Sequence, residues 1–191
     1  MTVLTLNLQQ FVETAAEFWE LCQANPDLRL ERTATGEVVI MPPAFTETGR
    51  RNFKISGQLW QWNETWQLGE AFDSSAGFTL PNGAIRSPDT AWIAKERWES
   101  LSDEAKYGFA AICPDFVVAL RSSSDALKAL RAKMQEYIEN GAQLGWLIDS
   151  QARTVEIYEP GEAVETLHDP ATVTGDPHLP HFVLNLQKVW G

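Results

Sequence analysis

The sequence predicts an α/β fold in which a mixed central sheet is flanked by helices and extended by additional antiparallel strands. The apolar runs Phe116 to Leu120 and Leu144 to Ile148 enclose a helical segment, and such a unit is typical of two buried parallel strands. Shorter alternating segments bounded by Gly and Pro predict the antiparallel strands. Because 44% of the 191 residues are apolar, the chain can fill one core, and we expect a single domain over residues 1–191.

The N-terminal third predicts a helix, a hairpin and a longer helix, over Glu13 to Ala24, Leu28 to Arg32 with Glu37 to Met41, and Thr46 to Gln67. The hairpin turns at Thr35-Gly36. In the longer helix, spacings of four, three and four place one set of apolar residues on one face: Ile55, Leu59, Trp62 and Trp66. We interpret this face as core rather than as a platform for stacked bases.

The rest of the chain predicts short strands, a short surface helix and one more long helix. The short strands are expected at Ala71-Phe72, Gly77 to Leu80 and Asp89 to Ile93, the surface helix at Trp98 to Ala105, and an antiparallel pair at Arg153 to Tyr158 and Ala163 to Leu167, before a tail from Phe182 to Trp190. The long helix, Ala126 to Asn140, is expected to be capped within the cluster Ser122 to Asp125 and to end at Gly141.

The charge of the chain argues against nonspecific coating of nucleic acid. The formal net charge is -11 and the pI is near 4.7, whereas such coating requires neutralisation of many phosphates. A local basic patch of Arg50, Arg51 and Lys54 could still contact phosphate, although the same residues also fit a solvated first turn of a helix.

Cysteine usage and hydropathy indicate an intracellular protein. Cys22 and Cys113 have no metal-type spacing and predict reduced thiols. No uncharged apolar stretch reaches the roughly 20 residues of a membrane span, so we expect a cytoplasmic location. His168, His178 and His181 lie in an irregular stretch without a partner at zinc-site spacing, which favours a loop.

Asp89 and Lys133 are the first candidates for chemistry. A carboxylate at the start of a strand can bind a divalent cation, and a nearby lysine can orient water or offset developing charge, as in metal-assisted phosphodiester hydrolysis. Each has a structural alternative, because Pro-Asp is common in turns and a lysine at the edge of an apolar helix stripe often extends to solvent. Glu31 alternates with apolar Leu30, so it is either a solvated carboxylate or part of a site.

Three stretches resemble the Uma-two family of the PD-(D/E)XK, or restriction-endonuclease-like, superfamily. They are Leu80 to Trp92 with its Ser87-Pro88-Asp89, Cys113 to Val118 with its Pro114-Asp115, and Lys133 to Asp149 with Tyr137 and Gly141. The resemblance implies a restriction-endonuclease-like fold and a DNA endonuclease that uses Mg2+. It also implies that Asp89 binds the metal, that Lys133 is the catalytic lysine and that Glu31 assists the metal. A homodimer would allow two such sites to cut both strands.

At one position the chain departs from the family pattern. The family expects a glutamate in the strand after Pro114-Asp115, in a run resembling Val-Val-Glu-Leu, and this chain has Val117-Val118-Ala119-Leu120. A methyl group cannot coordinate Mg2+, so the loss of this ligand is expected to weaken ion binding severely. Asp115 shares a strand face with Ala119 but lies roughly 13 Å away along an extended strand, too far for simple replacement.

Three hypotheses follow. The first is a Mg2+-dependent DNA endonuclease, impaired at Ala119, with Asp89, Glu31 and Lys133 in its site. The second is a binding or interaction module that keeps the nuclease scaffold without its chemistry, so whether the chain is an enzyme stays open. The third is a hydrolase that acts on another phosphate ester or small molecule in the same cleft, which competition by DNA would distinguish.

Overall fold

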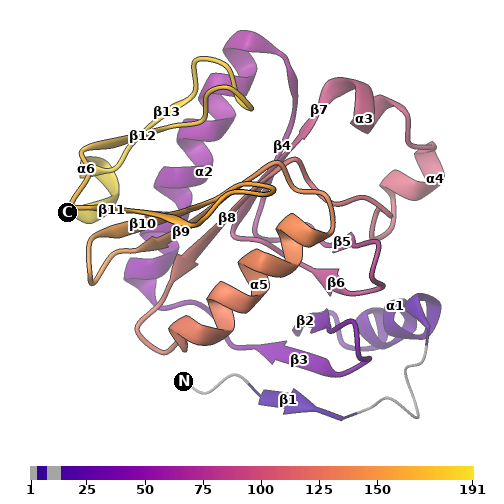
Figure 1. Ribbon diagram of the computed structural model, residues 1–191. Helices are drawn as coiled ribbons and strands as arrows, with labels where there is room; N and C mark the ends of the chain where they lie inside the picture. Colours follow the sequence, from indigo (N-terminus) through magenta and orange to yellow (C-terminus); the bar gives the residue numbers. More distant parts are fainter. Residues whose placement is uncertain (1–3, 8–13) are drawn as a thin grey trace.

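A six-stranded sheet forms the centre of the fold. The computed structural model describes residues 4–7 and 14–191, and Figure 1 shows the arrangement of their elements. The strands lie in the order β11-β10-β9-β8-β7-β4. Their bounds are β4 Gly69–Asp73, β7 Thr90–Ala94, β8 Phe116–Arg121, β9 Leu144–Asp149, β10 Thr154–Tyr158 and β11 Glu165–His168. Among these six strands only β8 and β9 pair in parallel, so the predicted mixed sheet and its parallel unit are confirmed.

Two long helices cover opposite faces of this sheet (Figure 1). On one face, Ile55 and Leu59 of α2 (Thr46–Trp66) share a core with the even-numbered residues of β8. On the other face, Met134 and Tyr137 of α5 (Leu127–Glu139) pack over Val117 and Ala119 of the same strand. Alternation along β8 therefore divides its side chains between two separate clusters.

A second sheet, of five short strands, lies beside the first in the order β1-β3-β2-β6-β5. Its strands are β1 Leu4–Leu6, β2 Arg29–Arg32, β3 Val38–Met41, β5 Phe78–Thr79 and β6 Ile85–Arg86. One face packs Leu30 and Val38 against Phe18 of α1 (Ala15–Ala24), which Thr14 and Glu17 begin with a reciprocal capping box. The predicted first helix included Glu13, which lies outside the described residues.

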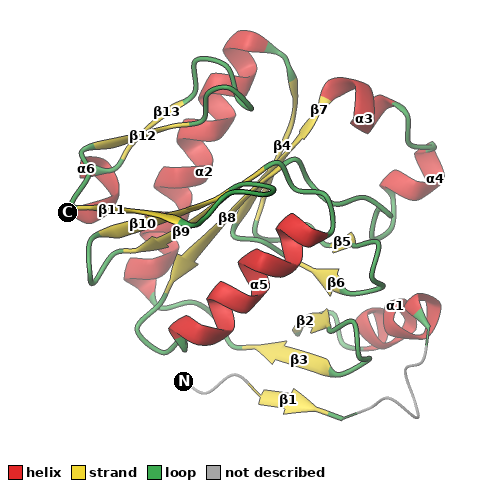
Figure 2. Ribbon diagram, in the orientation of Figure 1, coloured by secondary structure: helices red, strands yellow, loops and turns green. Residues whose placement is uncertain are grey.

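Two expectations about helices are wrong, one about the extent of a helix and one about a cap. The expected helix from Trp98 to Ala105 is divided into α3 (Lys95–Glu99) and α4 (Asp103–Lys106), which Figure 2 shows as separate helices. Ser102 has an extended backbone and caps α4 by accepting a hydrogen bond from the Ala105 amide. The cluster Ser122 to Asp125 does not cap α5, because the N-cap residue is Ala126, which forms no side-chain capping hydrogen bond. Instead the Asp125 carboxylate accepts a hydrogen bond from the Ser122 amide at 2.8 Å and closes a turn of its own.

The C-terminal segment completes the core on the α2 side. It consists of β12 (Thr172–Thr174), β13 (Val183–Asn185) and α6 (Gln187–Trp190). The ring of Phe182 lies 5.4 Å from that of Trp62 and 5.8 Å from that of Trp146, measured between centroids. Trp66, which the spacing assigned to the same buried face, is instead 46% exposed and stacks on His181.

Both cysteines are free thiols, as expected. Burial raises the pKa of Cys113 to about 12, so its thiol stays protonated and unreactive near neutral pH. Within the part of the chain that the structure describes, no helix combines the length and the apolar composition that crossing a membrane requires.

Candidate active site

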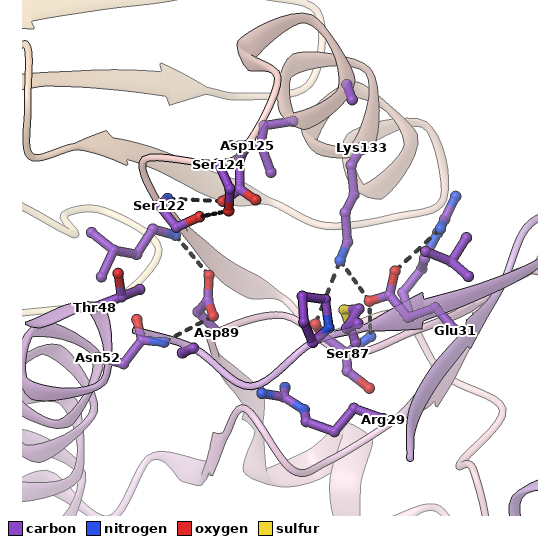
Figure 3. A pocket seen from close by; sticks show the side chains of 18 of the residues that line it. Arg29, Glu31, Thr48, Asn52, Ser87, Asp89, Ser122, Ser124, Asp125 and Lys133 are labelled. Atoms are coloured by element: carbon purple, nitrogen blue, oxygen red, sulfur yellow. Dashed lines mark hydrogen bonds and ion pairs between the residues drawn. The ribbon is translucent and has the colours of Figure 1, made fainter. Parts of the chain in front are cut away.

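A pocket of about 580 Å³ lies between the two sheets. Its walls come from β2 and β3, on the face opposite α1, and from the start of α2, the end of β8 and one side of α5 (Figure 3). The polar residues that line it are Arg29, Glu31, Thr48, Asn52, Arg86, Ser87, Asp89, Ser122, Ser124, Asp125, Lys133 and Glu136. All three predicted site residues, Asp89, Glu31 and Lys133, are therefore in one pocket.

Asp89 precedes β7 and is fixed to both neighbouring elements. Its backbone amide donates to the carbonyl of Val118 at 3.0 Å, so the chain is already paired with β8. One carboxylate oxygen, Oδ2, accepts a hydrogen bond from the Leu120 amide at 2.8 Å, and Oδ1 accepts one from Nδ2 of Asn52 at 3.0 Å. The side chain thereby supplies the hydrogen-bond acceptor for Leu120 of β8, and Figure 3 shows it beside Asn52.

Glu31 lies in β2 and is only 3% exposed. Its Oε1 accepts hydrogen bonds from Lys133 Nζ at 2.5 Å and from the Ser87 amide at 2.8 Å, and its Oε2 faces a guanidinium nitrogen of Arg86 at 3.3 Å. A carboxylate this deeply buried requires compensation, and two cations and one backbone amide provide it. The alternative of a solvated surface carboxylate is therefore excluded for Glu31.

Lys133 reaches into the pocket from α5 rather than outward to solvent. Its ammonium group pairs with Glu31 and also lies 3.5 Å from the carbonyl of Ser87, two residues before Asp89. Lys133 and Asp89 thus face the same polar space from opposite sides, as Figure 3 shows. The interpretation of Lys133 as a lysine that only extends to solvent does not fit this orientation.

The two carboxyl groups are shifted in opposite directions. Burial is the largest influence on the pKa of Asp89 and raises it, against the weaker opposing effects of the Leu120 amide and Lys133. Burial also raises the pKa of Glu31, but the charges of Lys133 and Arg86 together with two hydrogen bonds outweigh it and hold that pKa below its usual value. Asp89 is thus the carboxyl that takes up a proton more readily, and Glu31 the one that keeps its charge.

Ala119 is 5% exposed and packs in the cluster beneath α5, together with Met134 and Tyr137. Thr90 pairs with Val118, so extending this register by one residue places position 119 opposite Asp89. The hydroxyl of Tyr137, in the same cluster, is buried with no hydrogen-bond partner among the described residues. A longer polar side chain at position 119 would therefore start next to an unused donor and across from the pocket carboxylate.

The residues present fit a tightly held divalent cation poorly. Asp89 contributes one carboxylate, and the buried Oδ1 of Asn52, which has no hydrogen-bond partner within the described structure, adds a neutral oxygen beside it. Glu31 is engaged by two cations, which would repel a metal ion. The described residues also contain no group of three or more His, Cys, Asp or Glu side chains placed to hold a metal. Mg2+ in proteins is held by one or two carboxylates together with waters and substrate phosphates. Here both oxygens of the one available carboxylate, Asp89, already accept hydrogen bonds, so the ion would be held only weakly.

Of the pocket residues that the sequence did not predict, Asn52 and Arg86 make side-chain contacts with the predicted carboxylates. Asn52 precedes Ile55 by three residues and so lies on the buried face of α2, where an amide side chain is unusual. A single polar residue on the apolar face of a helix was the feature of the sequence that could have identified Asn52. Arg86, which joins Glu31 to Glu136, belongs to a strand of two residues that left no periodic pattern to detect.

The proposed basic patch and the histidines lie elsewhere. Arg50 and Arg51 pair with Glu47, Arg51 also donates to the carbonyl of Val189, and Lys54 donates to the carbonyl of Lys188. None of the three lines the pocket, and each is engaged within the chain. His178 and His181 lie in turns, as expected, and His178 bonds to Glu159. The expected loop is wrong for His168, which is the last residue of β11 and pairs with Thr154.

Comparison with known proteins gives a consistent result. The model of the Uma2 family, described as "Putative restriction endonuclease", matches residues 15–187. Among solved structures, a crystal structure of a "putative nuclease belonging to DUF820" from Anabaena variabilis ATCC 29413 superimposes with a TM-score of 0.72. The match has 17% sequence identity and covers 84% of this chain and 89% of the other, so it supports the shared fold. No curated protein matches the sequence.

Proposed function

The chain belongs to the Uma2 family of restriction-endonuclease-like proteins, and on this basis we propose that it is a DNA endonuclease whose cleavage is impaired at Ala119. The observation that carries the proposal is the meeting of Asp89, Lys133 and Glu31 in one pocket, although they come from three distant stretches of chain. The nuclease chemistry that the family implies requires a carboxylate and a lysine in this relation.

Each residue then has a distinct role. Asp89 is the remaining metal-side carboxylate, held in place by the Leu120 amide and Asn52. Lys133 orients the attacking water or offsets the charge that develops on the phosphate. Glu31, the second predicted metal-side carboxylate, fixes the position of Lys133 through their ion pair and would assist a cation only after that pair opens.

Mg2+ is the expected cofactor. When bound, it would polarise the phosphate and lower the pKa of a water molecule, which the side chains alone do not do. Because the residues present fit the ion poorly, we expect weak binding and slow cleavage in the natural sequence. A homodimer, which would pair two sites for double-strand cleavage, stays a prediction of the family resemblance.

The second candidate function is a binding or interaction module without catalysis. Ala119 favours it, because the expected ligand is absent and the methyl group is packed into the core beneath α5. The pairing of Lys133 and Arg86 with Glu31 also favours it, since these two cations already neutralise the carboxylate that would otherwise attract a metal ion.

Cleavage of supercoiled plasmid with Mg2+ or Mn2+ distinguishes these functions when the natural chain is compared with Ala119→Glu and Ala119→Gln. The glutamine has the size of glutamate without its charge, so it controls for crowding at a buried position. We expect metal-dependent nicking to increase at least about tenfold for Ala119→Glu only, and to disappear when Asp89→Asn is added. If Ala119→Glu folds, and its activity equals that of Ala119→Gln, the nuclease proposal fails and the binding module remains.

A further inference from the structure

One wall of the pocket is apolar, which a site that contacts only phosphate does not need. Val39 and Met41 of β3 and the segment Pro42 to Phe45 line one side, and Leu130 of α5 lines another. Phe45 is 42% exposed at the start of α2, so an aromatic ring is available at the mouth. The apolar wall adjoins Glu31 directly, because Val39 is its strand partner.

The cations of the pocket are poorly arranged to follow a duplex backbone. Lys133 and Arg86 are both paired with Glu31, and Arg86 also pairs with Glu136. Arg29 is the one pocket cation without a carboxylate at ion-pair distance among the described residues; its guanidinium donates to the carbonyl of Ser74. One available guanidinium can bind one phosphate, whereas proteins that track duplex DNA engage about six to ten.

From these two observations we infer that the pocket binds a single unpaired nucleotide of a DNA strand, with the base against the apolar wall and the adjoining phosphate near Arg29. This inference rests on the proposed nuclease function and specifies its substrate as single-stranded or locally unpaired DNA. Stacking against apolar and aromatic side chains tolerates any base and does not depend on charge, which suits a chain of net charge -11.

The dimensions of the pocket agree with such a ligand. Its volume of about 580 Å³ lies within the range of about 300–1,000 Å³ that small-molecule and cofactor sites usually have. The base of a paired nucleotide is stacked inside its duplex and cannot reach a wall recessed between two sheets. A base in a single strand, a bulge or a frayed end can.

The position of the wall also places the backbone at the reactive residues. Arg29 and Glu31 are on the same face of β2, since their separation is even, and Met41 is the strand partner of Arg29. A base on Met41 with its phosphate at Arg29 would therefore direct the next phosphodiester toward Asp89 and Lys133, which lie deeper in the same pocket.

Equilibrium binding tests the inference without requiring cleavage. Fluorescein-labelled DNA of one mixed sequence is titrated with the full chain as a single strand, a blunt duplex and a duplex with a two-base bulge, in EDTA and at several salt concentrations. We expect the single strand and the bulged duplex to bind at least about tenfold more tightly than the blunt duplex, with a log–log salt slope of about 1.

Matched variants locate the contact. Phe45→Ala should weaken single-strand binding about tenfold and restore the fluorescence of a 2-aminopurine placed in the strand. Phe53→Ala, which removes an equally large ring from α2 outside the pocket, should leave binding unchanged. Arg29→Met should lower the salt slope by about 0.7, with exposed Lys95→Met as its control.

The outcomes separate the inference from the function on which it rests. Tighter binding of the blunt duplex with a steep salt slope, or equal effects of Phe45→Ala and Phe53→Ala, would overturn the inference and leave a duplex endonuclease intact. If none of the three DNA forms binds, the proposed nuclease function fails together with the inference.

Discussion

The two faces of the central sheet differ in chemistry, although strand β8 contributes to both. Phe116, Val118 and Leu120 face an apolar cluster rich in aromatic rings on the α2 side. Val117 and Ala119 face α5, which also carries Lys133, half-buried and paired with the buried Glu31. The difference indicates that the α2 side mainly supplies stability, and that the α5 side accepts costly buried charges in order to hold a polar pocket.

The largest expected effect is on the aromatic side. Trp146→Ala should lower the free energy of unfolding by about 3–5 kcal/mol, because the indole is fully buried against the rings of Phe116 and Phe182. Urea denaturation followed by circular dichroism measures this change. A loss below about 1 kcal/mol would mean that this face does not carry the stability of the fold.

Glu31→Gln should cost about 3 kcal/mol on the pocket side, since it leaves Lys133 and Arg86 without their shared carboxylate in a buried setting. Glu70→Gln, at an exposed position of β4, is the control and should change the free energy of unfolding by less than about 0.5 kcal/mol. Adding Lys133→Met should recover part of the loss, because it removes one of the two uncompensated charges. Additive losses in the double variant would show that the two residues are not coupled.

The two pocket carboxyls should give opposite pH dependences of stability. The pKa of Glu31 is lowered by the fold, so its stabilisation is fully present above the unfolded pKa of about 4.3 and is lost as pH falls through the native pKa. The pKa of Asp89 is raised, so its contribution is present below about pH 3.9 and is lost as pH rises through the native pKa.

Urea denaturation of the natural chain, Glu31→Gln and Asp89→Asn between about pH 3 and 7 measures this pair of slopes. The advantage of the natural chain over Glu31→Gln should increase with pH, and its advantage over Asp89→Asn should decrease. Slopes of the same sign would contradict the assigned environments.

The smallest effect is expected at Trp66. Trp66→Ala should cost about 1 kcal/mol or less, because the indole is nearly half exposed and its main neighbour is the ring of His181. Trp62→Ala, one turn earlier and 7% exposed, should cost about 3 kcal/mol or more. Equal costs would place both rings in the same core.

Strong periodicity in the sequence predicted the long elements well. The helices α2 and α5, the hairpin of β2 and β3, and the parallel pair of β8 and β9 agree with expectation because each buries a continuous apolar face. The strands β1, β6 and β12 have two or three residues and depend on pairing with distant partners, so no local pattern predicts them. The prediction that Trp66 is buried was wrong, because the spacing defines a face of α2 but not how much of that face the C-terminal segment covers.

The candidate site was only partly visible in the sequence. Family resemblance pointed to Asp89 and Lys133, and the structure brings them to one pocket. Strand alternation could not decide between solvent and site for Glu31, because β2 is covered on both faces, by α1 on one and by the pocket on the other. The contacts of Arg86 and Asn52 require tertiary structure, since their partners are 37 to 55 residues away in the sequence.

A calorimetric titration with Mn2+ tests the central claim most directly. The natural chain, Ala119→Glu, Ala119→Gln and Ala119→Glu with Asp89→Asn would be compared after circular dichroism has established that each is folded. We predict that Ala119→Glu binds one ion at least about tenfold more tightly than the natural chain and Ala119→Gln, and that the double variant loses this gain. Equal affinities for all four proteins would contradict the assignment of Asp89 and position 119 to one metal site.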